Sequence, residues 1–248
     1  MIIIKSAQEI EIMRQAGKIA AEALLRLSKM IRPGITTGKL DSLALSYIKK
    51  YRAKPVFLGY HGFPASICTS INNEVVHGIP GLRRLMEGDI ISIDIGVSFK
   101  GYCGDAACTF PVGDVSPLAQ RLIEATRGAL VQGIKKAVPG NHLYDISHAI
   151  QTFAEEHGFS VVRNYVGHGI GSAMHEEPQV PNFGLPGKGL VLEEGMVLAI
   201  EPMVNSGSWE VKTLKDGWTV VTRDKGLSAH FEHTVAILEN GPEILTTL

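Results

Sequence analysis

The stretch that decides the fold is residues 89–110, which read DIISIDIGVSFKGYCGDAACTF. It consists of two apolar runs separated by a short segment near residues 99–100. Apolar runs of this length, separated by a turn signal, predict two buried strands that pair as a hairpin. Each run contains one acid, Asp94 in the first and Asp105 in the second. With a turn centred near residues 99–100, the two carboxylates are expected directly opposite each other across the hairpin.

Two facing carboxylates in buried strands need an explanation. An ionised carboxylate is costly to bury unless it is paired or binds a metal, and like charges directly opposite each other destabilise a sheet. Either acid alone could cap a turn or pair with a lysine or arginine. A cation held between Asp94 and Asp105 accounts for both acids at once, so the hairpin is interpreted as one side of a metal site.

Two glutamates and a histidine extend this pattern along the chain. Glu201 follows an apolar run, and Glu232 lies inside the apolar segment 229–237. Either glutamate alone could face solvent at the end of a strand. His168 lies in Gly167–Gly171, where the glycines allow the backbone to approach a neighbour closely. That segment could instead be a simple turn, and it lacks the Lys-Ser/Thr of a phosphate-binding loop.

Together, five side chains suit a site for two divalent metal ions: Asp94, Asp105, His168, Glu201 and Glu232. The four carboxylates supply the negative charge that balances two divalent cations. Carboxylates combined with one imidazole suit cobalt, manganese, iron, zinc or nickel better than calcium. Two such ions can share a water, lower its pKa and polarise a carbonyl group, which is hydrolytic chemistry.

The rest of the chain repeats one order of elements. A helix, a Pro-Gly stop, a second helix and a group of strands occur twice, with the Pro-Gly pairs at 33–34 and 139–140. The repeat predicts a single domain, residues 1–248, with pseudo-symmetric halves 1–112 and 113–248. The predicted helices are Ser6–Met30, Thr37–Tyr51, Ser116–Ala137 and Leu143–His157. The strongest strand signals are Asp89–Val97, Tyr102–Phe110, Gly195–Ile200, Trp218–Thr222 and Ala229–Leu238.

Composition and charge exclude several classes of protein. The 248 residues are 45% hydrophobic and 20% charged, which is typical of a globular chain with a sizeable core. Lys and Arg number 24 against 25 Asp and Glu, and this balance gives no support to direct nucleic-acid binding. The sequence contains no apolar run long enough to span a membrane. Three cysteines without a Cys-x-x-Cys pair, and no signal peptide, predict a cytoplasmic protein.

The order and spacing of these residues resemble the methionine aminopeptidase family over essentially the whole chain. Asp94 and Asp105 are eleven residues apart, and Gly167–Gly171 is followed by His175-Glu176-Glu177-Pro178. The resemblance is to the short bacterial type I branch, because Glu201 and Glu232 are only 31 residues apart and leave no room for the helical insertion of type II. It implies an α+β "pita-bread" fold, a curved antiparallel β-sheet covered by two pairs of helices.

The resemblance also implies a role for each predicted metal ligand. Asp94 and Asp105 would bind one ion and bridge to the other, Glu232 would bridge as well, and His168 and Glu201 would complete the coordination of the other ion. Glu201, beside the attacking water, would accept its proton, which requires hydrogen-bond reach.

Further residues of the site follow from the same resemblance. His175 would donate to the carbonyl oxygen of the scissile bond as it becomes anionic, and His77 would contact the scissile amide nitrogen. Either histidine could instead be a loop residue bonded to backbone. A narrow apolar pocket for the methionine side chain would be walled by Tyr60, Phe63, Cys68 and Trp218, with His77 at its edge.

Two positions depart from the family pattern, and one further ligand is implied. Phe63 stands where many bacterial members have Tyr, and Met174 stands where an aromatic residue often precedes the second histidine. Both changes keep the pocket wall apolar. The family can also hold a monovalent cation, which here would lie near Ser70, Asn72 and Ser228.

The activity implied by the resemblance is removal of the initiator methionine from nascent proteins whose second residue is small. The working partner would be the nascent chain at the ribosome exit tunnel, and the protein is expected to be a monomer. Basic residues that could dock on the ribosome, or simply form solvated charge runs, are Arg83 and Arg84, or Lys49, Lys50, Arg52 and Lys54. Two alternatives stay open: a prolidase or Xaa-Pro aminopeptidase, and a non-catalytic protein of the same fold that binds peptides or RNA.

Overall fold

The computed structural model describes residues 1–247 and contains four long helices within that range. These are α1 (Ala7–Ser28), α2 (Thr37–Lys50), α3 (Pro117–Ile134) and α4 (Leu143–Glu156). A short 3-10 helix spans Tyr60–Gly62. None of the helices in residues 1–247 combines the length and apolar character needed to cross a bilayer.

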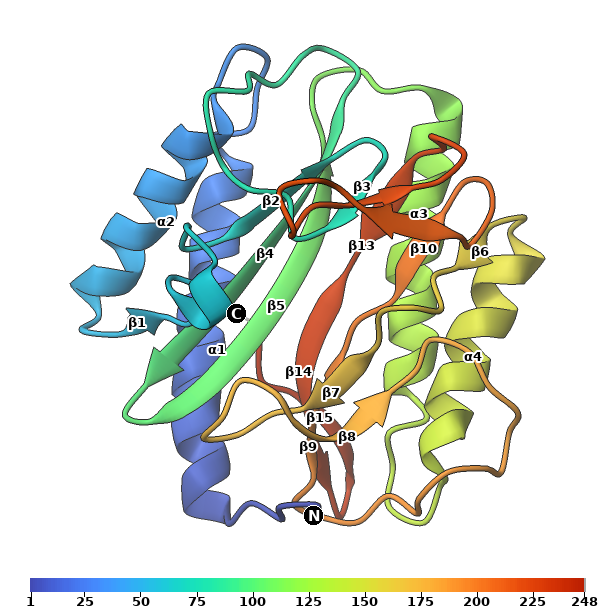
Figure 1. Ribbon diagram of the computed structural model, residues 1–248. Helices are drawn as coiled ribbons and strands as arrows, with labels where there is room; N and C mark the ends of the chain where they lie inside the picture. The colour runs from blue at the N-terminus through green and yellow to red at the C-terminus, as the bar shows by residue number, and fades with distance from the viewer. Residues whose placement is uncertain (248) are drawn as a thin grey trace.

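Most strands form one curved antiparallel sheet, which occupies the centre of Figure 1. Its main path runs β1-β4-β5-β14-β9-β7-β8, while β2 pairs with β4 and β15 pairs with β14. The bounds are β1 (Lys54–Pro55), β2 (Cys68–Ile71), β4 (Ile90–Phe99), β5 (Tyr102–Pro111), β7 (Gly167–Gly169), β8 (Glu176–Val180), β9 (Val197–Ile200), β14 (Glu232–Leu238) and β15 (Gly241–Ile244).

Two small sheets complete the strand content of residues 1–247. One has the order β13-β10-β6 and the other β11-β12-β3. The bounds of these strands are β3 (Glu74–Val76), β6 (Ser160–Val161), β10 (Met203–Asn205), β11 (Val211–Thr213), β12 (Val220–Thr222) and β13 (Ser228–His230).

Two helix pairs cover the large sheet, α1 with α2 and α3 with α4 (Figure 1). The predicted helix starts are confirmed: Ser6 and Glu9 form a capping box at α1, and Ser116 caps α3 with Pro117 at its first position. Each pair buries its own apolar cluster against the sheet. The first cluster includes Leu40 and Ile93, and the second contains residues of α3, α4, β9 and β14. The fold is therefore α+β, a curved antiparallel sheet with two pairs of helices, as predicted.

The hairpin of β4 and β5 forms as predicted, but its register differs from the expected one. The turn consists of Lys100 and Gly101, which both have positive φ, 48° and 87°. This two-residue turn pairs Phe99 with Tyr102, so Asp94 lies opposite Ala107 and not opposite Asp105. The expectation of two directly facing carboxylates was therefore wrong. A shift of two residues preserves the face of a strand, so both acids still point to the same side.

The predicted strand Ala229–Leu238 was also wrong as a single element. Residues 228–230 form β13, which pairs with β10, whereas residues 232–238 form β14 in the large sheet. The break falls at Phe231, whose amide donates to the carbonyl of Pro202 at 3.3 Å. Pro202 has no amide hydrogen with which to continue the β9 ladder. The large sheet therefore ends here on both β9 and its neighbour β14.

Candidate metal centre and substrate pocket

The structure brings the five predicted metal ligands together on neighbouring strands. Asp94 lies on β4, Asp105 on β5, Glu232 at the start of β14 and His168 on β7, while Glu201 directly follows β9. These strands are consecutive in the sheet order. All five side chains line the same cavity.

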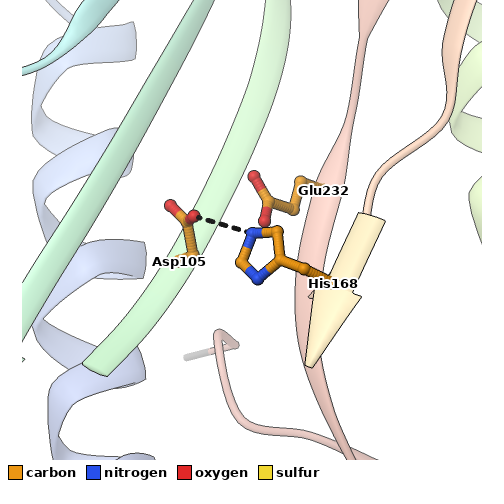
Figure 2. A group of neighbouring side chains, drawn as sticks. All are labelled: Asp105, His168 and Glu232. Carbon is orange, nitrogen blue, oxygen red and sulfur yellow. Dashed lines mark ion pairs between the residues drawn. The ribbon is translucent and has the colours of Figure 1, made fainter. Parts of the chain in front are cut away.

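Three of the five converge tightly, as Figure 2 shows. Asp105, His168 and Glu232 each offer a ligand atom, and these atoms all lie within 4.8 Å of one another. The Nε2 atom of His168 lies 3.9 Å from Oδ2 of Asp105 and 3.5 Å from Oε1 of Glu201. Such spacing leaves room for a cation to be coordinated between the donor atoms.

The glycines around His168 allow this convergence. A Cβ atom on Gly167 would lie 2.3 Å from the carbonyl oxygen of Ala199, and one on Gly169 would lie 2.2 Å from that of Glu177. The close backbone approach that the sequence predicted is therefore confirmed. The Nδ1 atom of His168 lies 2.8 Å from the carbonyl oxygen of Gly169, an arrangement that fixes the ring and leaves Nε2 for the cluster.

A hydroxyl bridge fixes Asp105 across the line where β5 meets β14. The Thr234 hydroxyl accepts the Asp105 amide at 2.9 Å and donates to the Asp105 carbonyl, also at 2.9 Å. This side chain replaces the ladder bonds at that position, since β5 and β14 pair only at Glu232 with Ala107 and at His233 with Ala106.

Unsatisfied polar atoms indicate that the donor set fits a metal. Within residues 1–247, one carboxylate oxygen each of Asp94, Asp105 and Glu232 is buried without a hydrogen-bond partner. Orphaned buried oxygens are rare in folded proteins and commonly mark a bound ion or water. Three orphaned carboxylate oxygens beside a free imidazole nitrogen form the oxygen-rich, mixed donor set of transition-metal sites.

Burial dominates the electrostatics of this cluster. Removal from water, and then the Asp105 charge, raise the pKa of Asp94 and of Glu232 well above the usual range. Burial, followed by the charge of Glu201, raises the pKa of Asp105 to about 8, and burial raises that of Glu201 to about 8. Burial also lowers the pKa of His168 to about 4, so its imidazole is neutral and can act as a ligand.

An apolar wall adjoins the acids in the same cavity, which has a volume of about 150 Å³. The four predicted wall residues line it: Tyr60, Phe63, Cys68 and Trp218. The rings of Phe63 and Trp218 pack edge to face at 5.1 Å. Burial raises the pKa of the Cys68 thiol well above its usual value, so Cys68 is a neutral apolar surface.

Both further predicted histidines also line the cavity. His175 packs its ring 4.4 Å from that of His168, and its Nδ1 lies 2.6 Å from the Tyr60 hydroxyl. The ring of His77 lies edge-on to Trp218 at 6.3 Å. Burial lowers the pKa of His77 to about 4 and also lowers that of His175, so both rings are neutral near pH 7.

The three residues named for a monovalent cation lie on neighbouring segments. The Ser228 amide donates to the carbonyl of Asn72 at 2.8 Å, and the Ser70 hydroxyl accepts the Gly78 amide at 3.2 Å. The Asn72 side chain is already bonded to Asp89 and Ile90.

Sequence reasoning missed two residues of the site. Phe57 lines the cavity and is buried, and His230 contributes a buried imidazole whose Nε2 lies 3.7 Å from Oε2 of Glu201. His230 stands two residues before Glu232, but the chain changes sheet at Phe231, so the alternation of a single strand does not link the two side chains. Nothing in the sequence distinguishes Phe57 from other core aromatics.

Comparison with known proteins identifies the family. The family model of metallopeptidase family M24 matches residues 11–239. Because this match spans most of the chain, the protein belongs to the M24 metallopeptidases, an assignment in keeping with the carboxylate and histidine cluster.

Relatives within that family are methionine aminopeptidases. The enzyme of Clostridium acetobutylicum is 60% identical over 247 residues, which are 99% of this chain and 99% of the relative. A crystal structure of methionine aminopeptidase from Thermotoga maritima matches with a TM-score of 0.99 at 50% identity, and the match covers 100% of both chains. The chain therefore belongs to the methionine aminopeptidases and has their pita-bread fold, as the sequence predicted.

A prolidase has a similar fold at much lower identity. The prolidase of Pyrococcus horikoshii gives a TM-score of 0.78 at 24% identity, and the match covers 99% of this chain and 63% of that one. A likeness at this identity shows the fold alone, so it does not favour the alternative of a prolidase.

Proposed function

We propose that the protein removes the initiator methionine from newly made proteins whose second residue is small. The observation that carries this proposal is one cavity that combines five metal donors with an apolar wall. High identity to methionine aminopeptidases over the full chain supports the same activity.

The donors fit two divalent metal ions, held by Asp94, Asp105, His168, Glu201 and Glu232. When bound, such ions supply Lewis-acid chemistry that lowers the pKa of a water and polarises the substrate carbonyl. The candidate metals are cobalt, manganese, iron, zinc and nickel, because carboxylate and imidazole donors suit all of them.

The protein's own residues move the protons of the reaction. Glu201 accepts the proton of the attacking water and lies beside the donor cluster, with Oε1 at 3.5 Å from His168. His175 donates a hydrogen bond to the substrate carbonyl oxygen as negative charge develops there. Because Nδ1 of His175 lies against the Tyr60 hydroxyl, the ring can present Nε2 to the substrate. His77 contacts the scissile amide nitrogen from the Trp218 side of the cavity.

The apolar wall selects an unbranched side chain. Tyr60, Phe63, Cys68 and Trp218 form the apolar side of a cavity that measures about 150 Å³ with its acidic side included. This narrow apolar side suits a thioether chain better than a bulky or charged one. Discrimination between side chains that differ by one methylene is worth only about 1–3 kcal/mol in such a pocket. The second residue would lie beside the metal donors, where a large side chain has no room.

The cellular setting follows from this activity. The protein would act in the cytoplasm as a monomer on nascent chains near the ribosome exit tunnel. Exposed basic residues such as Arg83 and Arg84 would provide the docking contacts. A monovalent cation near Ser70, Asn72 and Ser228 would brace the loops behind the cavity.

The test is methionine release from two peptides, Met-Ala-Ser and Met-Leu-Ser. The chelated protein is assayed before and after manganese or cobalt is added, with Asp105→Asn as the matched control because it keeps the side-chain shape and removes the charge. We expect metal-dependent cleavage of the alanine peptide only, and none in the Asp105→Asn variant. Failure of the folded protein to release methionine with any of the candidate metals would refute the proposal, and cleavage of an Xaa-Pro peptide instead would indicate a prolidase.

A further inference from the structure

His230 is a buried side chain to which the proposed function gives no role. It is 1% exposed, and its Nε2 has no hydrogen-bond partner among residues 1–247. A buried polar atom without a partner destabilises the folded state. A leucine of similar size would avoid that cost, so the imidazole at this position requires an explanation.

The backbone of His230 is held on two sides. Strand β13 pairs with β10, which places Met203 opposite His230. The Thr109 hydroxyl accepts the His230 amide at 2.9 Å and donates to its carbonyl at 2.8 Å. The backbone of His230 therefore cannot shift away from the site unless these bonds break.

The free nitrogen of His230 lies against Glu201. Its Nε2 is 3.7 Å from Oε2 of Glu201, while Nε2 of His168 is 3.5 Å from Oε1 of the same carboxylate. Each oxygen of Glu201 therefore has its own imidazole. A gap of 3.7 Å is slightly too long for a hydrogen bond and too short for a bridging water, which needs roughly 5 Å between the outer atoms. A small rotation of either side chain would close it.

A role as hydrogen-bond donor fits this geometry better than a role as metal ligand. Within residues 1–247, all five predicted ligands line the cavity, whereas His230 does not line it. Its ring approaches one oxygen of the donor set, Oε2 of Glu201 at 3.7 Å. A neutral imidazole carries one N–H, which is what a carboxylate oxygen without a partner accepts.

We propose that His230 is a positioning residue whose Nε2–H holds Oε2 of Glu201 and so directs Oε1 toward the donor cluster. Because Glu201 is the proton acceptor of the proposed function, this inference rests on that function. It adds a specific task for a residue that is neither a metal ligand nor part of the substrate pocket.

The test compares three variants with the wild-type protein. His230→Leu removes the donor at similar volume, His230→Gln provides an amide donor that can reach Glu201, and His230→Asn provides a donor too short to reach it. For each we would measure kcat and KM on Met-Ala-Ser with manganese, the affinity of the metal-free protein for Mn²⁺ by calorimetry, and the melting temperature. Loss of an outer contact to a metal ligand typically costs 10–100-fold in activity or metal affinity.

We expect His230→Leu and His230→Asn to lower kcat by about 10–100-fold with little change in KM, and His230→Gln to restore most of the loss. Wild-type turnover by His230→Leu would overturn the inference. So would a His230→Gln protein that melts like the wild type and is as slow as His230→Leu. If the wild-type protein releases no methionine, the proposed function fails, whereas the Mn²⁺ titration still tests whether the donor at position 230 acts on the metal site.

Discussion

A buried ion pair ties the start of the chain to the loop that carries His175. The ammonium of Lys5 lies 2.7 Å from Oε2 of Glu176, and the two side chains are only 3% and 4% exposed. The ammonium also donates to the Ile3 carbonyl at 3.0 Å, and Oε1 of Glu176 accepts the Ala173 amide at 3.2 Å. Because Glu176 directly follows His175, the pair fixes one end of the loop that carries His175.

We expect Lys5→Met to destabilise the protein strongly. Removal of one partner of a buried pair costs about 3–5 kcal/mol, because the other charge is left without compensation. Ile3 and Ile4 are 48% and 47% exposed, so water can enter beside them, and the lower end of that range applies. For a chain of 248 residues, about 2 °C of melting temperature corresponds to 1 kcal/mol, which gives a fall of roughly 6 °C.

The assay is thermal unfolding followed by circular dichroism, with chelator present so that metal binding does not contribute to stability. The double variant Lys5→Met/Glu176→Gln removes both charges and is expected to recover about half of the loss. A fall below about 2 °C for Lys5→Met, or a double variant whose loss equals the sum of the two single losses, would refute the reasoning.

Three further predictions concern the site and its supports. His175→Ala should lower kcat by about 10²–10³-fold with a small change in KM, as for loss of an oxyanion donor, and steady-state kinetics would contradict the assigned role if only KM changed. Gly169→Ala should lower the melting temperature, because its Cβ would lie 2.2 Å from the Glu177 carbonyl oxygen, whereas the control Gly81→Ala meets nothing within 4 Å; equal melting temperatures for the two variants would exclude this clash. The pKa of Glu9 is lowered to about 2, first by the Tyr102 hydroxyl and then by Ser6. Since this folded-state pKa lies below the unfolded value of 4.5, the stabilisation is present above pH 4.5 and is lost as the pH falls toward 2. The difference in melting temperature between wild type and Glu9→Gln should therefore shrink over that range, and a constant difference would contradict it.

The sequence predicted the helices and the set of acids because both depend on patterns that are local, whereas the fold class followed from the resemblance to the methionine aminopeptidase family. Helix caps such as Ser6 are satisfied within a single turn, and an acid inside an apolar run is anomalous wherever the run pairs. The exact register of β4 and β5 depended instead on Lys100 adopting a positive φ of 48°, which is uncommon for a residue with a side chain. The prediction of the site survived this error because strand faces alternate with a period of two.

The position of His230 in the site could not be predicted from local sequence patterns. Its side chain enters the site because β13 pairs with β10 and because Thr109, more than a hundred residues earlier, bonds both sides of its backbone. Such long-range pairings of three-residue strands leave no periodic signal in the sequence. The division of the chain into two related halves stays a prediction.

The metal donors lie on both sides of the line where β5 meets β14, which is held by few ladder pairs. Asp94 and Asp105 come from strands packed on the cluster under α1 and α2, whereas Glu201 and Glu232 adjoin the cluster under α3 and α4. Strands β5 and β14 pair at only two positions, with Glu232 opposite Ala107. Asp105 and Glu232 bring ligand atoms within 4.8 Å of each other across that line. A cation shared by Asp105 and Glu232 would therefore replace the repulsion between these carboxylates with an attraction that holds β5 against β14.

Metal removal should consequently weaken the pairing of β5 with β14 before it affects either helix pair. We expect amide hydrogen exchange at Ala106, Ala107, Glu232 and His233 to slow when Mn²⁺ is added to the metal-free protein, with little change in α2 or α4, which lie away from the cluster. Uniform protection across the whole chain would mean that the metal stabilises the fold globally. Unchanged exchange at these four amides, under conditions where calorimetry shows metal binding, would mean that the bound metal does not stabilise the pairing of β5 with β14.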